Sequence, residues 1–347
     1  MKPSYFCLTM RPFPATPSTK FYYPAGTHET AIDLLGRTIE DGEGIAVLTA
    51  DTGLGKTLVA HRLLERLGEV WNRSLLTNCR FAHRADLFRA ILFDLGQSYH
   101  GLGEQELRLA LTDFLLDELA AGRPTVLVLD EAQGLNSDLL EELRLLGNLE
   151  THQGKAVQII LIGQIDLHET LSRPGFAALQ QRVAAHAVLE RLDVHESVDF
   201  LMHQIRLAGG RPERIMTEEA MLILARTAGG VPRLLNRYAY QSLSFAEQVS
   251  ADRVDAEVVI ETLTQLGVEA DLSDEREVSS ADTVVSSATR VESRPASHPR
   301  APGGAGRPHI TSSSGTVGLR PNPIVSEAPW IAGSGTAPPT SICPMND

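Results

Sequence analysis

The chain has 347 residues, of which 43% are hydrophobic and 22% charged, and its formal net charge is −13. This composition is typical of a globular protein, and the negative charge argues against a nucleic-acid-binding surface spread over the whole molecule, although it leaves room for a local basic patch. No apolar run approaches the roughly 20 residues of a membrane helix, and Pro3, Pro12 and Pro14 interrupt the region where a signal peptide would have its apolar core. We therefore expect a cytoplasmic protein without a membrane span.

Residues 1–27 are rich in proline and aromatic side chains, which excludes a long helix there. We expect an extended segment that packs against the domain following it. A helix start is indicated near Thr27, with Ile32 and Leu35 on its buried side.

The next stretch combines a strand, a glycine turn and a helix. Apolar and β-favouring residues run from Ile45 to Ala50, Gly53 and Gly55 follow, and apolar residues then recur at helical spacing after Lys56-Thr57. This order is typical of a phosphate-binding loop, whose backbone N–H groups and helix dipole cradle phosphate oxygens. Lys56 would reach the β- and γ-phosphates of ATP, and the Thr57 hydroxyl would bind Mg²⁺. The expected nucleotide contacts are Ala50, Asp51, Thr52, Gly53, Leu54, Gly55, Lys56, Thr57 and Leu58.

One position in this loop departs from the motif. The pattern has glycine where this chain has Ala50. Because alanine is the smallest substitute, we expect a slightly altered entry into the loop and no loss of binding.

A second buried strand of chemical interest spans Thr125–Leu129 and ends in Asp130 and Glu131. Parallel strands present ligands at their carboxyl ends. Asp130 is therefore predicted to hold the Mg²⁺ shell, and Glu131 to polarise the attacking water as general base. A shorter strand over residues 73–78 and helices over 85–95 and 104–121 lie between the two motifs.

After a predicted helix at 137–150, another buried strand at 157–162 is followed by Gln164. Gln164 would lie at the same edge of the sheet and contact the γ-phosphate or its water. A short helix at 176–183 then precedes a fifth strand at 187–189, with Arg182 at the end of that helix.

The pattern changes to helices alone beyond residue 193. Helices are expected over 195–208, 218–227, 232–245 and 255–266, with start signals at Asp193, Thr217 and Pro232. From about Asp271 the composition shifts to Ser, Pro, Gly, Ala and Thr, which is typical of a disordered tail. An apolar patch around Trp330 is either a docking motif or an incidental part of a spacer.

As a set, these motifs resemble the ExeA-like family of AAA+ ATPases, which comprises general secretion pathway protein A and relatives in pilus biogenesis and DNA transposition. The similarity rests on the phosphate loop and on the segments Leu129-Asp-Glu-Ala-Gln133, Gln158-Ile-Ile-Leu-Ile-Gly-Gln164 and Gly229-Gly-Val-Pro-Arg233, and it extends from about Phe6 to Gly267. It implies an α/β fold, namely a three-layer P-loop NTPase (AAA+) core with a five-stranded parallel sheet, an α-helical lid and a disordered tail. The implied boundaries are 1–27 for the N-terminal segment, 28–192 for the core, 193–267 for the lid and 268–347 for the tail.

The resemblance also implies roles for individual residues. Gln164 looks like the first sensor, Arg233 like a second sensor that contacts the γ-phosphate from the lid, and Arg182 like an arginine finger supplied to a neighbouring subunit of a homo-oligomer. His186 stands where the family often has a second basic residue, which argues against a two-arginine arrangement.

The motifs favour one function and leave three alternatives open. The favoured function is an ATPase that hydrolyses MgATP to change the conformation of an unidentified protein partner in a secretion or pilus assembly. The first alternative is a transposition-type ATPase that acts on double-stranded DNA through the lid arginines. The second is a switch that binds ATP with little turnover, and the third is a functional tail whose presentation the ATPase only regulates.

Overall fold

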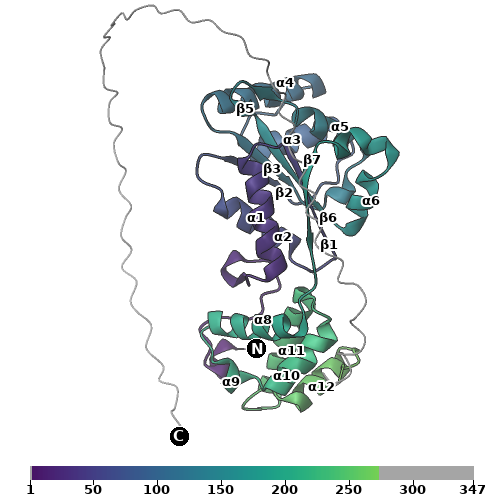
Figure 1. The fold of residues 1–347 in the computed structure, drawn as a ribbon. Helices are drawn as coiled ribbons and strands as arrows, with labels where there is room; N and C mark the ends of the chain where they lie inside the picture. The colour runs from purple at the N-terminus through teal and green to yellow at the C-terminus, as the bar shows by residue number, and fades with distance from the viewer. Residues whose placement is uncertain (1, 273–347) are drawn as a thin grey trace, which may run out of the picture. The chain divides into compact units, whose positions relative to one another are not determined.

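The computed structural model describes residues 2–272, which contain a five-stranded parallel sheet (Figure 1). Along the sheet the strand order is β2-β3-β6-β1-β7. All of the predicted strands are present. Every residue of β1, β3 and β6 is buried. The strands are β1 (Ile45–Ala50), β2 (Asn72–Leu76), β3 (Thr125–Leu129), β6 (Val157–Gly163) and β7 (Val183–Leu189).

Helices cover both faces of the sheet, because alternate side chains of each strand point to opposite faces. Leu127 and Leu129 pack with the third, fourth and fifth helices, whereas Val126 and Val128 pack with the first two. The result is the predicted three-layer core. Its helices are α1 (Gly26–Glu40), α2 (Lys56–Arg66), α3 (Arg84–Asp94), α4 (Glu104–Ala120), α5 (Ser137–Leu146), α6 (Ile165–Leu171) and α7 (Ala177–Gln180).

The sheet register fixes where the two chemical motifs meet. Strand β6 lies between β1 and β3, and it pairs Ile160 with Ala46 on one side and with Val128 on the other. Since all three strands are parallel, their carboxyl ends meet at one edge of the sheet. The residues that follow β1, β3 and β6 are therefore neighbours in space.

A second group of helices follows β7, as the sequence predicted. Asp193 and Glu196 form a capping box at the first helix, and the side chain of Thr217 accepts a hydrogen bond from the N–H of Ala220. Pro232 occupies the first turn of another helix, where its missing N–H costs nothing. The helices are α8 (Val194–Leu207), α9 (Pro212–Ile215), α10 (Glu218–Ala228), α11 (Pro232–Gln248) and α12 (Ala256–Gln265).

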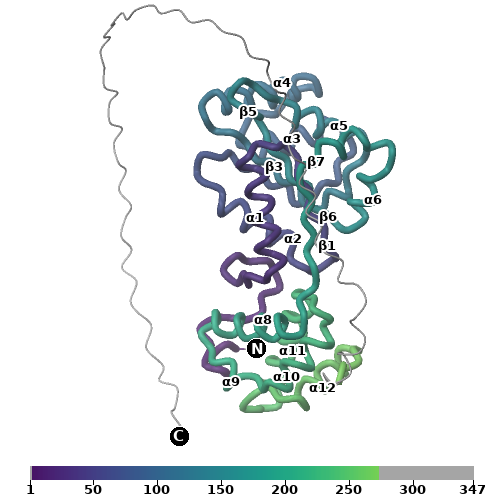
Figure 2. The backbone as a smooth tube through the Cα atoms, in the orientation of Figure 1, coloured from purple at the N-terminus to yellow at the C-terminus, as the bar shows by residue number. Residues whose placement is uncertain are grey.

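The first part of the N-terminal segment packs against these lid helices (Figure 2), whereas Tyr22 packs on α1 and α2 of the core, so the expectation that the segment lies on the core holds only for its second part. Phe6, Leu8 and Phe13 belong to the same buried cluster as residues of α8, α10 and α11. The Thr9 side chain donates to the carbonyl of Ala208 over 2.9 Å. Phe6, Leu8 and Phe13 are therefore buried against the lid, which the sequence pattern of the segment alone does not specify.

Smaller differences from the sequence prediction concern short elements. Helix α6 and a hairpin of β4 (Glu150–Thr151) and β5 (Gly154–Lys155) were not predicted, since neither is long enough to show a periodic pattern. Strand β7 begins at Val183 instead of residue 187, because its first residues are only partly buried and alternate poorly. Within residues 2–272, no helix is long and apolar enough to span a membrane. The predicted disordered tail and the Trp330 patch lie outside the described residues, apart from the first few residues of the tail.

Candidate active site

The phosphate loop connects β1 to α2 and has the glycine conformations that its sequence predicts. Gly53 and Gly55 have φ angles of 90° and 98°, a region that residues with a Cβ atom rarely adopt. A Cβ atom on Gly55 would lie 3.3 Å from Nε2 of the buried His28, and this nitrogen in turn lies 2.7 Å from the carbonyl oxygen of Leu54. The N-terminus of α2 follows directly, so its positive dipole end faces the loop.

Lys56 lies across the inside of this loop. Its Nζ donates to the carbonyls of Ala50 over 3.0 Å and of Asp51 over 3.1 Å. Burial lowers the pKa of Lys56, while the carboxylates of Glu131 and Asp130 oppose that shift. Ala50, the residue that departs from the motif, is fully buried as the last residue of β1.

Thr57 and Asp130 come together although they are 73 residues apart in the sequence. The Thr57 hydroxyl donates to Oδ2 of Asp130 over 2.5 Å, and Oδ1 of Asp130 accepts from the N–H of Glu131 over 2.9 Å. Burial raises the pKa of Asp130, and these two hydrogen bonds oppose the shift. A hydroxyl beside a carboxylate is the hard oxygen donor set that suits Mg²⁺ carried by a nucleotide, which needs only one or two protein ligands.

Glu131 and Gln164 are joined through a residue that the sequence analysis assigned no role. Glu131 has a left-handed backbone (φ 57°), and one of its carboxylate oxygens accepts a hydrogen bond from Nε2 of Gln133 over 2.5 Å. The other end of the same amide, Oε1 of Gln133, accepts from the backbone N–H of Gln164 over 3.2 Å. The sequence signal for Gln133 is its place two residues after Glu131, at the end of the segment Leu129-Asp-Glu-Ala-Gln133.

Arg233 lies near the phosphate loop through the first turn of α11. Its backbone N–H donates to the carbonyl of Gly53 over 3.3 Å, and a Cβ atom on Gly53 would lie 3.2 Å from Cβ of Arg233 and 3.0 Å from Val231. Its guanidinium is exposed. A second arginine that the sequence analysis missed, Arg191, forms an ion pair of 3.2 Å with Asp51, but both side chains are largely exposed and water screens such pairs.

Arg182 does not join this site. It directly precedes β7, whose first residue pairs with Ile45 at the start of β1, and the phosphate loop begins after the opposite end of that strand. Six strand residues at about 3.3 Å each separate the two ends by roughly 20 Å. Arg182 instead lines a separate cavity of about 280 Å³ together with Lys155, Gln181 and Glu43.

His186 does not supply a second cation beside Arg182. Its ring stacks on that of His168 with centroids 4.5 Å apart, and its Nε2 lies 2.8 Å from the Thr49 hydroxyl oxygen. Burial, followed by the charge of His168, lowers the pKa of His186 to about 4, so the ring is neutral at pH 7.

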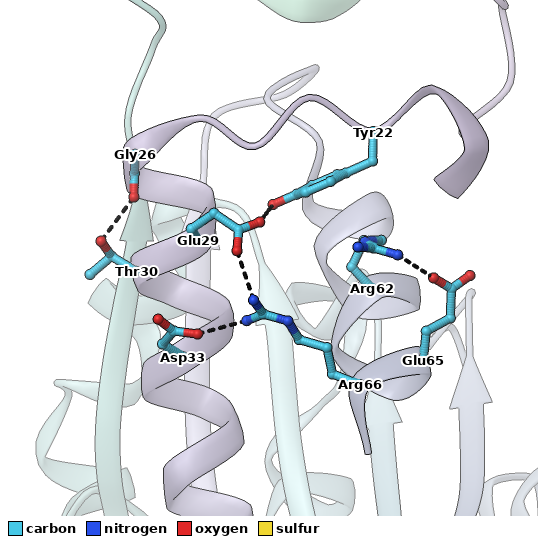
Figure 3. Close-up of polar contacts among 8 residues, drawn as sticks. All are labelled: Tyr22, Gly26, Glu29, Thr30, Asp33, Arg62, Glu65 and Arg66. Atoms are coloured by element: carbon cyan, nitrogen blue, oxygen red, sulfur yellow. Dashed lines mark hydrogen bonds and ion pairs between the residues drawn. The ribbon is translucent and has the colours of Figure 1, made fainter. Parts of the chain in front are cut away.

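The outer side of α2 is fixed to α1 and to the N-terminal segment. Arg66 forms ion pairs with Glu29 over 2.9 Å and with Asp33 over 2.6 Å, and the Tyr22 hydroxyl donates to the other oxygen of Glu29 over 2.6 Å (Figure 3). Burial, together with Glu29, raises the pKa of Tyr22, so its hydroxyl keeps the proton it donates. This network holds the helix that begins with Lys56 and Thr57.

Comparison with known proteins identifies the fold that carries these residues. Residues 39–171 match the family described as AAA domain. The solved structure of the Aeropyrum pernix ORC2 protein in ADPNP–ADP complexes has a TM-score of 0.58 at 13% identity, covering 76% of this chain and 75% of that one. This chain has the AAA-class P-loop NTPase fold. The likeness to ORC2, at this identity, concerns the fold alone.

Two relatives of this chain match it over a longer stretch than the AAA domain. General secretion pathway protein A of Aeromonas hydrophila is 36% identical over 237 residues, which are 68% of this chain and 43% of the relative. This agrees with the predicted resemblance to that family, although the chain matches less than half of the relative's length. ATP-dependent target DNA activator B of Escherichia phage Mu is 22% identical and covers 67% of this chain and 69% of the relative.

Proposed function

We propose that this chain binds MgATP in the phosphate loop and hydrolyses it, and that the lid transmits the change to a protein partner. The observation that carries the proposal is the contact between Thr57 and Asp130, because it joins the phosphate loop to the acidic pair at one edge of the sheet. ATP hydrolysis needs the phosphate loop and the acidic pair at the same site. Two chance sequence matches would not be expected to lie together in the fold.

Some of the site residues would bind MgATP, and others would take part in its hydrolysis. Lys56 and the N-terminus of α2 would hold the phosphates, while Thr57 and Asp130 would hold Mg²⁺, which neutralises charge on the phosphate oxygens when bound. Glu131 would orient and polarise the attacking water, and Gln164 would contact the γ-phosphate. Arg233 would contact the nucleotide from the lid, whose first turn already touches Gly53. Loss of the γ-phosphate would then release the lid.

A homo-oligomer and a protein partner complete the proposal. Arg182 lies about 20 Å from the phosphate loop of its own chain, so a finger role requires a neighbouring subunit. The partner is proposed to be part of a secretion or pilus assembly, because the chain resembles general secretion pathway protein A. A cytoplasmic location is part of this proposal.

The test is phosphate release by the purified protein over a series of protein concentrations. Glu131→Gln keeps the size of the side chain and removes the base, so it should reduce kcat by at least about 100-fold while ATP still binds. Glu40→Gln, which changes an exposed glutamate on α1, should leave the rate unchanged. A rate per subunit that stays flat and near zero, with ATP binding intact, would instead favour the nucleotide switch.

A second candidate function is action on double-stranded DNA, which the likeness to target DNA activator B favours. Arginines of the core such as Arg123 and Arg144 pair with neighbouring carboxylates. By contrast, several lid arginines form no ion pair with any residue in the described part of the chain, which leaves their charge available to phosphates. They are Arg206, Arg211, Arg214, Arg226 and Arg237.

If DNA binds through the lid, affinity should fall steeply with salt. Changing both Arg211 and Arg214 to Gln should reduce the slope of log K against log salt by about 2, because each phosphate contact contributes about 0.9. Changing Arg123 and Arg144 to Gln removes the same charge from the core and should leave the slope unaltered. Absence of binding at low salt would reject this candidate.

A further inference from the structure

The side chain of Gln133 connects the ends of two neighbouring strands at the proposed catalytic edge. Its Nε2 donates to Oε2 of Glu131 over 2.5 Å, and its Oε1 accepts from the backbone N–H of Gln164 over 3.2 Å. Glu131 follows β3 and Gln164 follows β6, so the amide spans from one strand end to the next. Both polar ends of the side chain are therefore occupied by groups of the proposed active site.

The backbone contact determines which way the amide points. An N–H group can only donate, so the atom of Gln133 that faces the N–H of Gln164 has to be the oxygen. The NH₂ group is then the one directed at Glu131, where it meets a carboxylate that can only accept when ionised. Hydrogen bonds to a charged group are stronger than those between neutral groups, which favours one fixed carboxylate orientation.

The chain also leaves room for this amide at Gly163, the last residue of β6. A Cβ atom on Gly163 would lie 2.7 Å from Oε1 of Gln133 and 2.8 Å from a methyl carbon of Leu167. Both distances are shorter than real Cβ contacts, so the Gln133 side chain would have to move. No positive φ angle requires glycine at this position, and the space taken by the Gln133 amide and the Leu167 side chain therefore accounts for it.

We propose that Gln133 is a positioning residue, which holds the Glu131 carboxylate in its working orientation and ties it to the end of β6. This inference rests on the proposed ATP hydrolysis. Glu131 would meet the attacking water. Its left-handed backbone alone does not fix the orientation of its carboxylate. Through the amide, the support of the base is tied to the backbone of Gln164. Gln133 itself acts through Glu131 and need not touch ATP.

Two substitutions separate the parts of this role. Gln133→Met keeps the length of the side chain and removes both hydrogen bonds, whereas Gln133→Glu keeps the acceptor for Gln164 and removes the donor to Glu131. In both variants kcat should fall by about 10- to 100-fold, the effect of losing a hydrogen bond to a charged group. KM for ATP and the melting temperature should stay close to those of the wild type. Gln153→Glu, in an exposed turn, controls for the added charge and should leave kcat unchanged.

A double-mutant cycle tests whether Gln133 acts through Glu131. In a Glu131→Gln background, Gln133→Met should cause no further loss of the residual rate, because the group it positions is already gone. Gly163→Ala should lower kcat in the same direction as Gln133→Met, because it displaces the same amide. An equal loss in both backgrounds would overturn the proposal, as would unchanged kcat in folded Gln133 variants.

The same series separates this inference from the proposed function. If the wild type shows no turnover that depends on Glu131, the proposed function fails and the inference fails with it. If the wild type turns over and Glu131→Gln abolishes the rate, but the Gln133 variants match the wild type, only the inference fails. A fall in ATP affinity equal to the fall in kcat would assign Gln133 a purely structural role and would also overturn the inference.

Discussion

Thr57 is the residue whose contact best defines the proposed site, since its hydroxyl meets the carboxylate of Asp130. Sequence pattern predicted both residues as Mg²⁺ ligands, but only the parallel register of β1, β6 and β3 brings them within hydrogen-bond distance. Their joint role as a metal site is a proposal that can be tested at a single atom, the Thr57 Oγ1.

Thr57→Val removes that oxygen and keeps the shape of the side chain. The Mg²⁺ concentration needed for half-maximal phosphate release should rise by about tenfold or more, since a tenfold change corresponds to about 1.4 kcal/mol and one of two protein ligands is lost. Thr57→Ser keeps the hydroxyl and should stay within about twofold of the wild type. An unchanged Mg²⁺ requirement in the Val variant would exclude Thr57 as a ligand.

At the scale of the elements, a glycine pair just before α11 packs against Leu192, which lies in the segment that follows β7. Gly229 and Gly230 both have positive φ angles, of 55° and 71°, but their surroundings differ. A Cβ atom on Gly230 would lie 2.0 Å from the carbonyl oxygen of Leu192, a backbone atom that cannot easily move. On Gly229 it would meet only an arginine nitrogen at 3.9 Å.

Gly230→Ala should therefore destabilise the protein by more than about 3 kcal/mol, since strain and a backbone clash add together. Gly229→Ala should cost about 1 kcal/mol, the strain of a left-handed residue alone. Chemical denaturation of the two variants would measure the difference. Equal effects would show that the close approach of Gly230 to Leu192 does not determine the stability of this junction.

At the scale of the whole molecule, Arg182 lies too far from its own phosphate loop to act there, so it could serve as a finger only at an interface with a neighbouring subunit. Mixing Arg182→Ala protein with Glu131→Gln protein should restore activity, because one kind of mixed interface combines the intact arginine of one subunit with the intact base of the other. Each variant alone should be nearly inactive, and Arg173→Ala, at another exposed position of the core, should retain activity. A mixture no more active than its components would reject Arg182 as a finger supplied in trans.

Much of the fold was predictable from local patterns. The five strands and the long helices of core and lid were located, because buried strands read as apolar runs and lid helices begin with clear capping residues such as Asp193 and Thr217. Short elements such as α6 and the β4–β5 hairpin were missed, since few residues carry too little periodic signal. Local pattern also did not show that the first part of the N-terminal segment packs on the lid, because aromatic side chains fit any apolar surface.

The sequence by itself determined the chemistry of the phosphate loop and the acidic pair, because glycine conformations, a lysine and two carboxylates are properties of short segments. The tertiary structure decided which of these segments meet. Strand order placed β6 between β1 and β3, set Gln133 between Glu131 and Gln164, and put Arg182 at the far end of its strand. These relations depend on pairing between residues distant in the chain, which the spacing of residues within a segment does not encode.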